Sequence, residues 1–211
     1  MKMTKRIAAM AACTVMTLST AMSVTVSAMD TTEQFTSISE SANAPLTIIK
    51  SISGYSNYAV QQEGDGSCWA ACILSVLKYH DYRTTETFED IYRQANRLTG
   101  SNMSVGDAIA TSKLPVIISH YLGMSKITSS YGYYYEQIYS HLVADEPLIG
   151  IINNGNNTYH AVVIYGFEGS EFNGEHYTTY LRIMNPSTGT CSKVLYRDFT
   201  WAAIYGYSNL V

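Results

Sequence analysis

The chain has 211 residues, of which 46% are apolar and 14% are charged, and its net charge at pH 7 is −4. This composition can fill a hydrophobic core, which excludes a largely disordered chain, and the length allows one domain plus a removable leader. No run of basic residues occurs beyond the extreme N-terminus, so nothing in the composition indicates a nucleic-acid partner.

The N-terminus has the pattern of a signal peptide. Lys2, Lys5 and Arg6 precede an apolar stretch, and Val26-Ser27-Ala28 is a small-residue cleavage site. Thr and Ser interrupt the stretch, which argues against a permanent transmembrane helix. We therefore predict a signal peptide over residues 1–28, cleavage near Ala28, and a secreted chain without a stable membrane anchor. A lipid anchor at Cys13 is a weaker alternative, because too few apolar residues precede it.

Residues 29–53 follow the leader and contain few large apolar residues. They are rich in Ser, Thr, Glu and Asn, which predicts a linker or a short pro-segment that blocks a cleft until it is trimmed. The apolar residues 46–49 within it are compatible with either a strand or a plug. A globular domain is expected over residues 54–211.

The first half of this domain is predicted to be helical. Residues 63–66 form a Gly-rich turn, and Ser67 is expected to cap a buried helix from Cys68 to about His80. Apolar residues at helical spacing predict further helices over residues 87–97, 104–112 and 133–143.

The apolar pattern then changes to that of strands. Strands are expected over residues 147–152, 159–167, 177–184, 193–196 and 201–207, with polar turns at 153–158 and 168–175. Helices followed by antiparallel strands indicate an α+β fold. The central helix would carry Cys68, and the C-terminal sheet would carry His160 and Asn185.

Three cysteines remain once the leader is removed, namely Cys68, Cys72 and Cys191. An odd number leaves at least one free thiol in a monomer. A bridge between Cys72 and Cys191 stays open, because the sequence does not contain its geometry. Cys68, Cys72 and His160 lack the spacing of a tight metal site, and no metal or cofactor is expected.

Cys68 is the candidate nucleophile, because it begins the predicted buried helix directly after the Gly-rich turn. An ordinary thiol with a pKa of about 8.5 is mostly protonated at pH 7, whereas the N–H groups and dipole of a helix N-terminus favour the thiolate. The alternative is that Cys68 is only a small buried hydrophobe. For Cys72, one turn into the same helix, that alternative is favoured.

A cysteine nucleophile needs a base, and His160 is the best placed of the five histidines. It stands near the start of an apolar strand, directly after a polar turn. His80 ends the Cys68 helix, about 18 Å along its axis. The remaining three are expected to be solvated, namely His120, His141 and His176. A purely structural role for His160 is the alternative.

Two further polar residues have positions that suit this chemistry. Asn185 ends a predicted strand before Pro186, where its amide would orient His160 or would simply form a turn. Gln62 precedes Cys68 by six residues across the Gly-rich turn. Its amide would stabilise an oxyanion together with the Cys68 N–H, or would be an ordinary solvated side chain.

Taken together, these segments resemble the papain clan of cysteine peptidases. The run from Gln62 to Ala70 is similar to that family's nucleophile segment, with a Gln six residues before a Cys-Trp pair. The run from Tyr159 to Phe167 resembles its His-Ala-Val strand, and Asn185-Pro186 resembles its third site, in the same chain order. The resemblance implies a papain-like fold with Cys68 as nucleophile, His160 as base, Asn185 as its orienter and Gln62 as oxyanion donor.

The chain also departs from the plant enzyme. Asp65 stands where plant and lysosomal members carry a disulfide Cys, and the separation between Cys68 and His160 is shorter. In size the chain resembles compact bacterial members, such as staphopain-like peptidases and those that trim double-glycine leaders. The resemblance implies a bacterial peptidase that hydrolyses peptides or proteins through a thioester. With the predicted signal peptide, we expect this peptidase to be secreted, and we expect a monomer. An amidase or acyl transferase acting on cell-wall or other peptides, and a non-catalytic binding module, stay open as alternatives.

Overall fold

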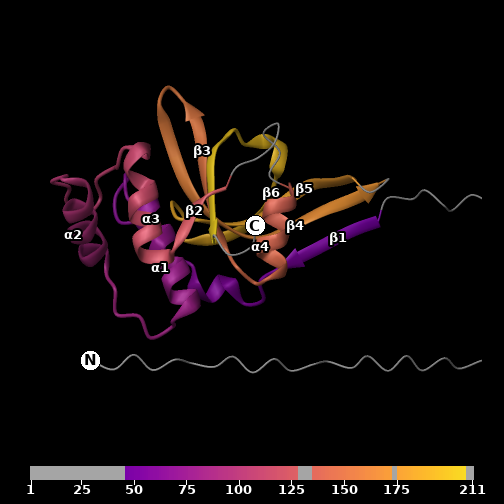
Figure 1. The fold of residues 1–211 in the computed structure, drawn as a ribbon, viewed down its shortest axis with the longest axis horizontal. Helices are drawn as coiled ribbons and strands as arrows, with labels where there is room; N and C mark the ends of the chain where they lie inside the picture. Colours follow the sequence, from indigo (N-terminus) through magenta and orange to yellow (C-terminus); the bar gives the residue numbers. More distant parts are fainter. Residues whose placement is uncertain (1–45, 128–134, 173–174, 208–211) are drawn as a thin grey trace, which may run out of the picture. The chain divides into compact units, whose positions relative to one another are not determined.

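The computed structural model describes residues 46–127, 135–172 and 175–207. The predicted leader and residues 29–45 of the predicted linker lie outside these described residues. Among the described helices, none is both long enough and apolar enough to cross a membrane. In Figure 1, α1, α2 and α3 gather on one side, and the strands lie beside them with α4 near β1 and β4.

The α-helices of the described chain all lie before residue 144. Their bounds are α1 Cys68–His80, α2 Phe88–Thr99, α3 Leu114–Leu122 and α4 Tyr135–Val143. The prediction of α1 is confirmed at both ends, and those of α2 and α4 agree within two residues, with residues 133 and 134 outside the described ranges. α1 is buried from Cys68 to Val76, as expected for an apolar helix without a solvated face.

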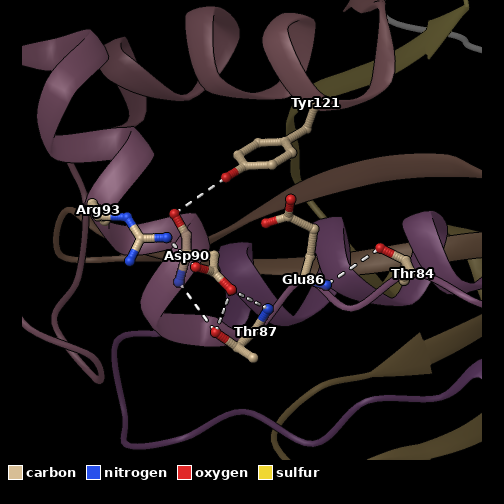
Figure 2. A network of polar contacts seen from close by, with 6 residues as sticks. All are labelled: Thr84, Glu86, Thr87, Asp90, Arg93 and Tyr121. Carbon is tan, nitrogen blue, oxygen red and sulfur yellow. Dashed lines mark hydrogen bonds and ion pairs between the residues drawn. The ribbon is translucent and has the colours of Figure 1, made fainter.

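A capping box fixes the start of α2 (Figure 2). Thr87 Oγ1 accepts the Asp90 N–H at 3.3 Å, and Asp90 Oδ2 accepts the Thr87 N–H at 3.1 Å. The Thr87 bonds, with Arg93 as a further partner, lower the pKa of the Asp90 carboxyl. Tyr121 of α3 donates to the Asp90 carbonyl at 3.3 Å, so the same corner joins α2 to α3.

The helix predicted over residues 104–112 is wrong. Gly106 has a φ of +98°, which a right-handed helix does not accommodate. The segment is instead a loop held by side chains, since Asn96 of α2 bonds both the N–H and the carbonyl of Met103 at 2.8 Å. The next helix is α3, which begins after this loop and was not predicted. It has Pro115 near its start, where proline is tolerated.

The described strands form one antiparallel seven-stranded sheet. Its order is β2-β7-β3-β4-β5-β6, and β1 pairs with β4. The bounds are β1 Leu46–Ser51, β2 Met124–Lys126, β3 Leu148–Gly155, β4 Thr158–Phe172, β5 Glu175–Asn185, β6 Thr190–Leu195 and β7 Trp201–Tyr207. The turn predicted at residues 168–175 is wrong, because β4 continues to Phe172 through irregularities in its pairing with β5.

β1 settles the choice between strand and plug for residues 46–49. It pairs with β4 from Gly166 to Glu171, so these residues are not part of a linker. Ile52 follows directly, is 4% exposed, and donates its N–H to Tyr165 O at 2.9 Å. Residues 46–52 therefore belong to the folded domain.

The core lies between α1 and the sheet. α1 packs against β4 on one side and against α2 and α3 on the other. Tyr55 is 1% exposed, stacks on Tyr165 of β4 at 5.1 Å, and bonds Ser75 Oγ of α1 at 3.0 Å. These contacts hold the middle of α1 against the middle of β4.

Candidate active site

Cys68 is the first residue of α1 and is 8% exposed. The turn before it is held by Ser67, whose hydroxyl donates to Glu63 O at 2.6 Å instead of capping the helix as predicted. Gly66 donates its N–H to Gly106 O at 3.0 Å. A Cβ on Gly66 would lie 2.2 Å from the Ala108 nitrogen, so this close approach requires glycine.

The loop over residues 101–110 packs beside the nucleophile. Trp69 Nε1 and the Tyr92 hydroxyl both donate to the Asp107 carbonyl, at 3.4 Å and 2.6 Å. The two rings lie 4.9 Å apart, so α1 and α2 meet at this carbonyl. The sequence did not point to this loop, although Gly106 was a signal that the expected helix was interrupted.

The environment of Cys68 favours the neutral thiol. Burial raises the pKa of Cys68, and the N–H groups of Ala161, Trp69 and Cys68 itself lower it in part. The helix N-terminus therefore contributes as expected, but burial outweighs it. Ala161 N donates to Cys68 Sγ at 3.4 Å, which brings the sulfur against β4 one residue from His160.

The orientation of His160 follows from its bond to Asn185. His160 Nε2 lies 2.9 Å from Asn185 Oδ1, and the Ser187 N–H also meets this Oδ1, at 3.0 Å. A backbone N–H needs an acceptor, so the shared atom is the amide oxygen and Nε2 carries the proton. In neutral His160 the lone pair is then on Nδ1, where it can accept a proton.

Gln62 docks onto the turn that carries Asn185. Its N–H donates to Pro186 O at 2.9 Å, and its Oε1 accepts the Ser187 hydroxyl at 3.3 Å. Its Nε2 gives one hydrogen to Gly64 O at 2.8 Å, which leaves the second for another acceptor. The structure thus brings Gln62 and Asn185 together, and Cys68 against the strand of His160.

A pocket of about 80 Å³ opens beside Cys68. Its lining combines the start of α1, the loop before α3 and the strands β3 and β4. The residues are Asp65, Gly66, Cys68, Trp69, Ala108, Ile109, Thr111, Leu114, Ile151, Tyr159 and Ala161.

The remaining thiols lie in other surroundings. Within the described ranges Cys68, Cys72 and Cys191 are all free, so the bridge between Cys72 and Cys191 is not formed. Cys72 is fully buried, as expected, and Cys191 is half-buried. The described residues contain no group of three or more His, Cys, Asp or Glu side chains that would hold a metal ion.

His141 corrects one prediction, because it is not solvated. It is 1% exposed, and its Nδ1 lies 3.1 Å from Glu146 Oε2. A Cβ on Gly206 would lie 2.5 Å from its Nε2, so the ring occupies space left by that glycine. His120 is exposed, as expected, and the side chain of His176 lies outside the described part of the chain.

Known proteins share sequence or structure with this chain. A family model described as "Papain-like cysteine protease AvrRpt2" matches residues 51–201. Among solved structures, the chain is similar to a C39-like peptidase from Bacillus anthracis, with 20% identity, 77% of this chain and 99% of that chain covered, and a TM-score of 0.48. Among curated proteins, no significant sequence match was found.

Proposed function

Given that the chain belongs to the papain-like cysteine protease family, whose model matches residues 51–201, we propose that Cys68, His160 and Asn185 are its catalytic residues. The reaction is hydrolysis of peptide bonds in proteins or peptides through a thioester on Cys68. Gln62 and the Cys68 N–H donate to the oxyanion. All four residues lie in one chain, which supports a protease that acts as a monomer.

The observation that carries this proposal is that β4 contacts both α1, which carries Cys68, and β5, which carries Asn185. One residue of this strand, Ala161, donates its N–H to Cys68 Sγ at 3.4 Å. Its neighbour, His160, is held at 2.9 Å by Asn185 of β5. A nucleophile, a base and a residue that orients the base are the three parts that cysteine hydrolysis requires.

In the first half of the proposed reaction, Cys68 is acylated by the substrate. Burial keeps Cys68 protonated, so its proton passes to His160 Nδ1 as the sulfur attacks the substrate carbonyl. The developing oxyanion accepts the Cys68 N–H and the second Nε2 hydrogen of Gln62. His160, now protonated on both nitrogens, then gives the Nδ1 proton to the leaving amine, and a thioester remains.

Hydrolysis of the thioester reverses these proton transfers. His160 Nδ1 removes a proton from water, and the hydroxide attacks the thioester carbonyl. Collapse of the intermediate releases the carboxylic acid, and the sulfur recovers its proton from His160. Throughout, Asn185 Oδ1 keeps the Nε2–H bond and holds the ring in one orientation.

We test the thioester by acid-quench mass spectrometry with p-nitrophenyl acetate. The expected result is a burst of p-nitrophenol and an acetyl group on the peptide that contains Cys68. His160→Ala is expected to slow this burst by about 10²–10⁴, the usual contribution of a general base. Acetylation of Cys72 or Cys191 in place of Cys68 would contradict the proposal.

Export of the chain is a second part of the proposal. It is supported by the charged start, apolar stretch and Val26-Ser27-Ala28 site of the N-terminus. Secretion from a bacterial host should yield a protein whose intact mass is that of a chain beginning at Met29. A secreted or cell-associated product that retains residues 1–28 would contradict it.

A further inference from the structure

The pocket beside Cys68 has a wall made by the loop before α3. Ala108 and Ile109 come from this loop, Leu114 from α3, and Ile151 from β3. Leu114 is 3% exposed and Ile151 2%, so these two side chains form a packed back wall. Ile109 is partly buried and Ala108 is exposed, so they lie nearer the opening.

The wall is held in place from behind. Asp107, next to Ala108, accepts bonds from Trp69 and Tyr92 through its carbonyl. The Gly66 N–H donates to Gly106 O, and Gly66 lies so close to Ala108 that a Cβ on Gly66 would not fit. A wall anchored to two helices resists displacement, so a side chain that is too large for the pocket is not accommodated by a small shift.

The volume limits what the pocket accepts. An apolar cavity of about 150 Å³ holds a benzene ring. The pocket of about 80 Å³ is roughly half that size. It therefore has room for a short branched chain of three or four carbons, and not for an aromatic ring.

The lining also selects by polarity. Ile109, Leu114 and Ile151 offer only carbon, and among the described residues that line the pocket the one charged side chain is the exposed Asp65. An amine or carboxylate that entered would lose its water without gaining a partner at the back wall. Apolar substrate groups are thus favoured.

We propose that this pocket selects a short aliphatic side chain of the substrate and that Ile109 and Ala108 set its size. This inference rests on the proposed function, since it assigns the pocket beside the proposed nucleophile to the substrate. Adding or removing one methylene in such a pocket typically changes specificity by about 10–200-fold.

The test measures alkylation of Cys68 and does not need hydrolysis. N-isobutyl chloroacetamide and N-benzyl chloroacetamide are compared, with Cys191 of the same chain as the internal reference and peptide mass spectrometry as readout. After this normalisation, the isobutyl reagent is expected to react with Cys68 at least about tenfold faster than the benzyl reagent. Equal normalised rates would overturn the proposal.

Two variants change the pocket in opposite directions. Ile109→Ala should admit the benzyl reagent and bring the rate ratio close to one, whereas Ala108→Leu should slow the isobutyl reagent. Val116→Ala is the matched control, because Val116 is 45% exposed on α3 and does not line the pocket. If Ile109→Ala does not fold, Ala108→Leu still tests the proposal through the rate of the isobutyl reagent. If neither variant changes the ratio of the two alkylation rates, the proposal is contradicted.

Hydrolysis of matched peptides separates this inference from the proposed function. A peptide series with Val or Phe at each position around the cleavage site should show a preference for Val at one position. If no peptide is cleaved but the alkylation ratios hold, the proposed function fails, and only the size limit of the pocket stands. If peptides are cleaved without any aliphatic preference, the pocket assignment fails alone.

Discussion

At the scale of single residues, the site depends on how burial and hydrogen bonds oppose each other. Burial raises the pKa of Cys68 and favours the neutral thiol, although the residue begins a helix. In the proposed mechanism, the Nδ1 atom of His160 therefore accepts this proton. Asn185 Oδ1 and the Ser187 N–H together leave the lone pair on that atom.

Asn185→Ala tests this orientation. Loss of a hydrogen bond to a charged group costs about 1.5–3 kcal/mol, which corresponds to roughly 10–150-fold in rate. We expect kcat/KM for a peptide substrate to fall by that factor, with the fold kept. Asn154→Ala, at an exposed position of the same sheet, is the control. Equal loss in both variants, or no loss in Asn185→Ala, would contradict the role of Asn185.

Gln62→Ala tests the second donor to the oxyanion. Removal of one such donor typically lowers kcat by about 10²–10³. We expect that loss in steady-state kinetics with little change in KM. Gln61→Ala is the matched control, since Gln61 is exposed and adjacent. A change in KM alone would indicate that Gln62 only holds the Pro186 turn.

A functional residue can be predicted from the sequence when the pattern that marks it lies close to it in the chain. Cys68, His160, Asn185 and Gln62 each stand at a turn or an element end that the sequence marks. The burial of His141 was not predictable, because it depends on Gly206, a residue 65 positions away that leaves space for the ring.

At the scale of elements, the loop over residues 101–110 is as important as the helix that carries Cys68. It packs on the nucleophile turn and forms one wall of the pocket. Its apolar residues are spaced as in a helix, which explains the wrong prediction. Side-chain bonds from Asn96, together with the positive φ of Gly106, hold it as a loop instead of a helix.

Gly66→Ala tests the packing of this loop on the turn. The added Cβ would lie 2.2 Å from the Ala108 nitrogen, so the loop must move away. Overpacking of this kind typically costs about 1–3 kcal/mol, and we expect a lower melting temperature and at least tenfold lower kcat/KM. Gly155→Ala is the control, because its Cβ would meet nothing within 4 Å although its φ of +83° is strained. Equal losses of activity in both variants would contradict this account.

At the scale of the whole molecule, the described chain buries two of its three cysteines between the helices and the sheet. The α+β order and most strands were predictable, because the apolar residues have helical spacing in the first part of the domain and strand spacing after it. β2 and the pairing of β1 with β4 were not, since a three-residue strand has almost no pattern and pairing joins distant segments. These contacts arise only in the folded chain.

Buried thiols make the stability depend on pH. Burial raises the pKa of Cys72 well above the ordinary value of a thiol. Above about pH 9 the unfolded chain therefore releases a proton that the folded chain keeps, and the free energy of unfolding falls by up to about 1.4 kcal/mol per pH unit for each such group. Below that pH the contribution is complete.

Urea unfolding between pH 8 and 10.5 measures this dependence. Cys72→Ala should give a shallower fall of the free energy of unfolding with pH than the wild-type chain. Val76→Ala is the matched control, since Val76 is also fully buried in α1 but does not titrate. It should lower stability at every pH and leave the slope unchanged. A slope that Cys72→Ala does not change would contradict the assignment.

The central claim is that Cys68 is the nucleophile of a protease. The direct measurement is hydrolysis of denatured casein by the wild-type chain, Cys68→Ala and Cys191→Ala, with circular dichroism and thermal unfolding to confirm that each folds. We predict cleavage by the wild-type chain and by Cys191→Ala, and none by Cys68→Ala. Cleavage by a folded Cys68→Ala variant at the wild-type rate would contradict the account.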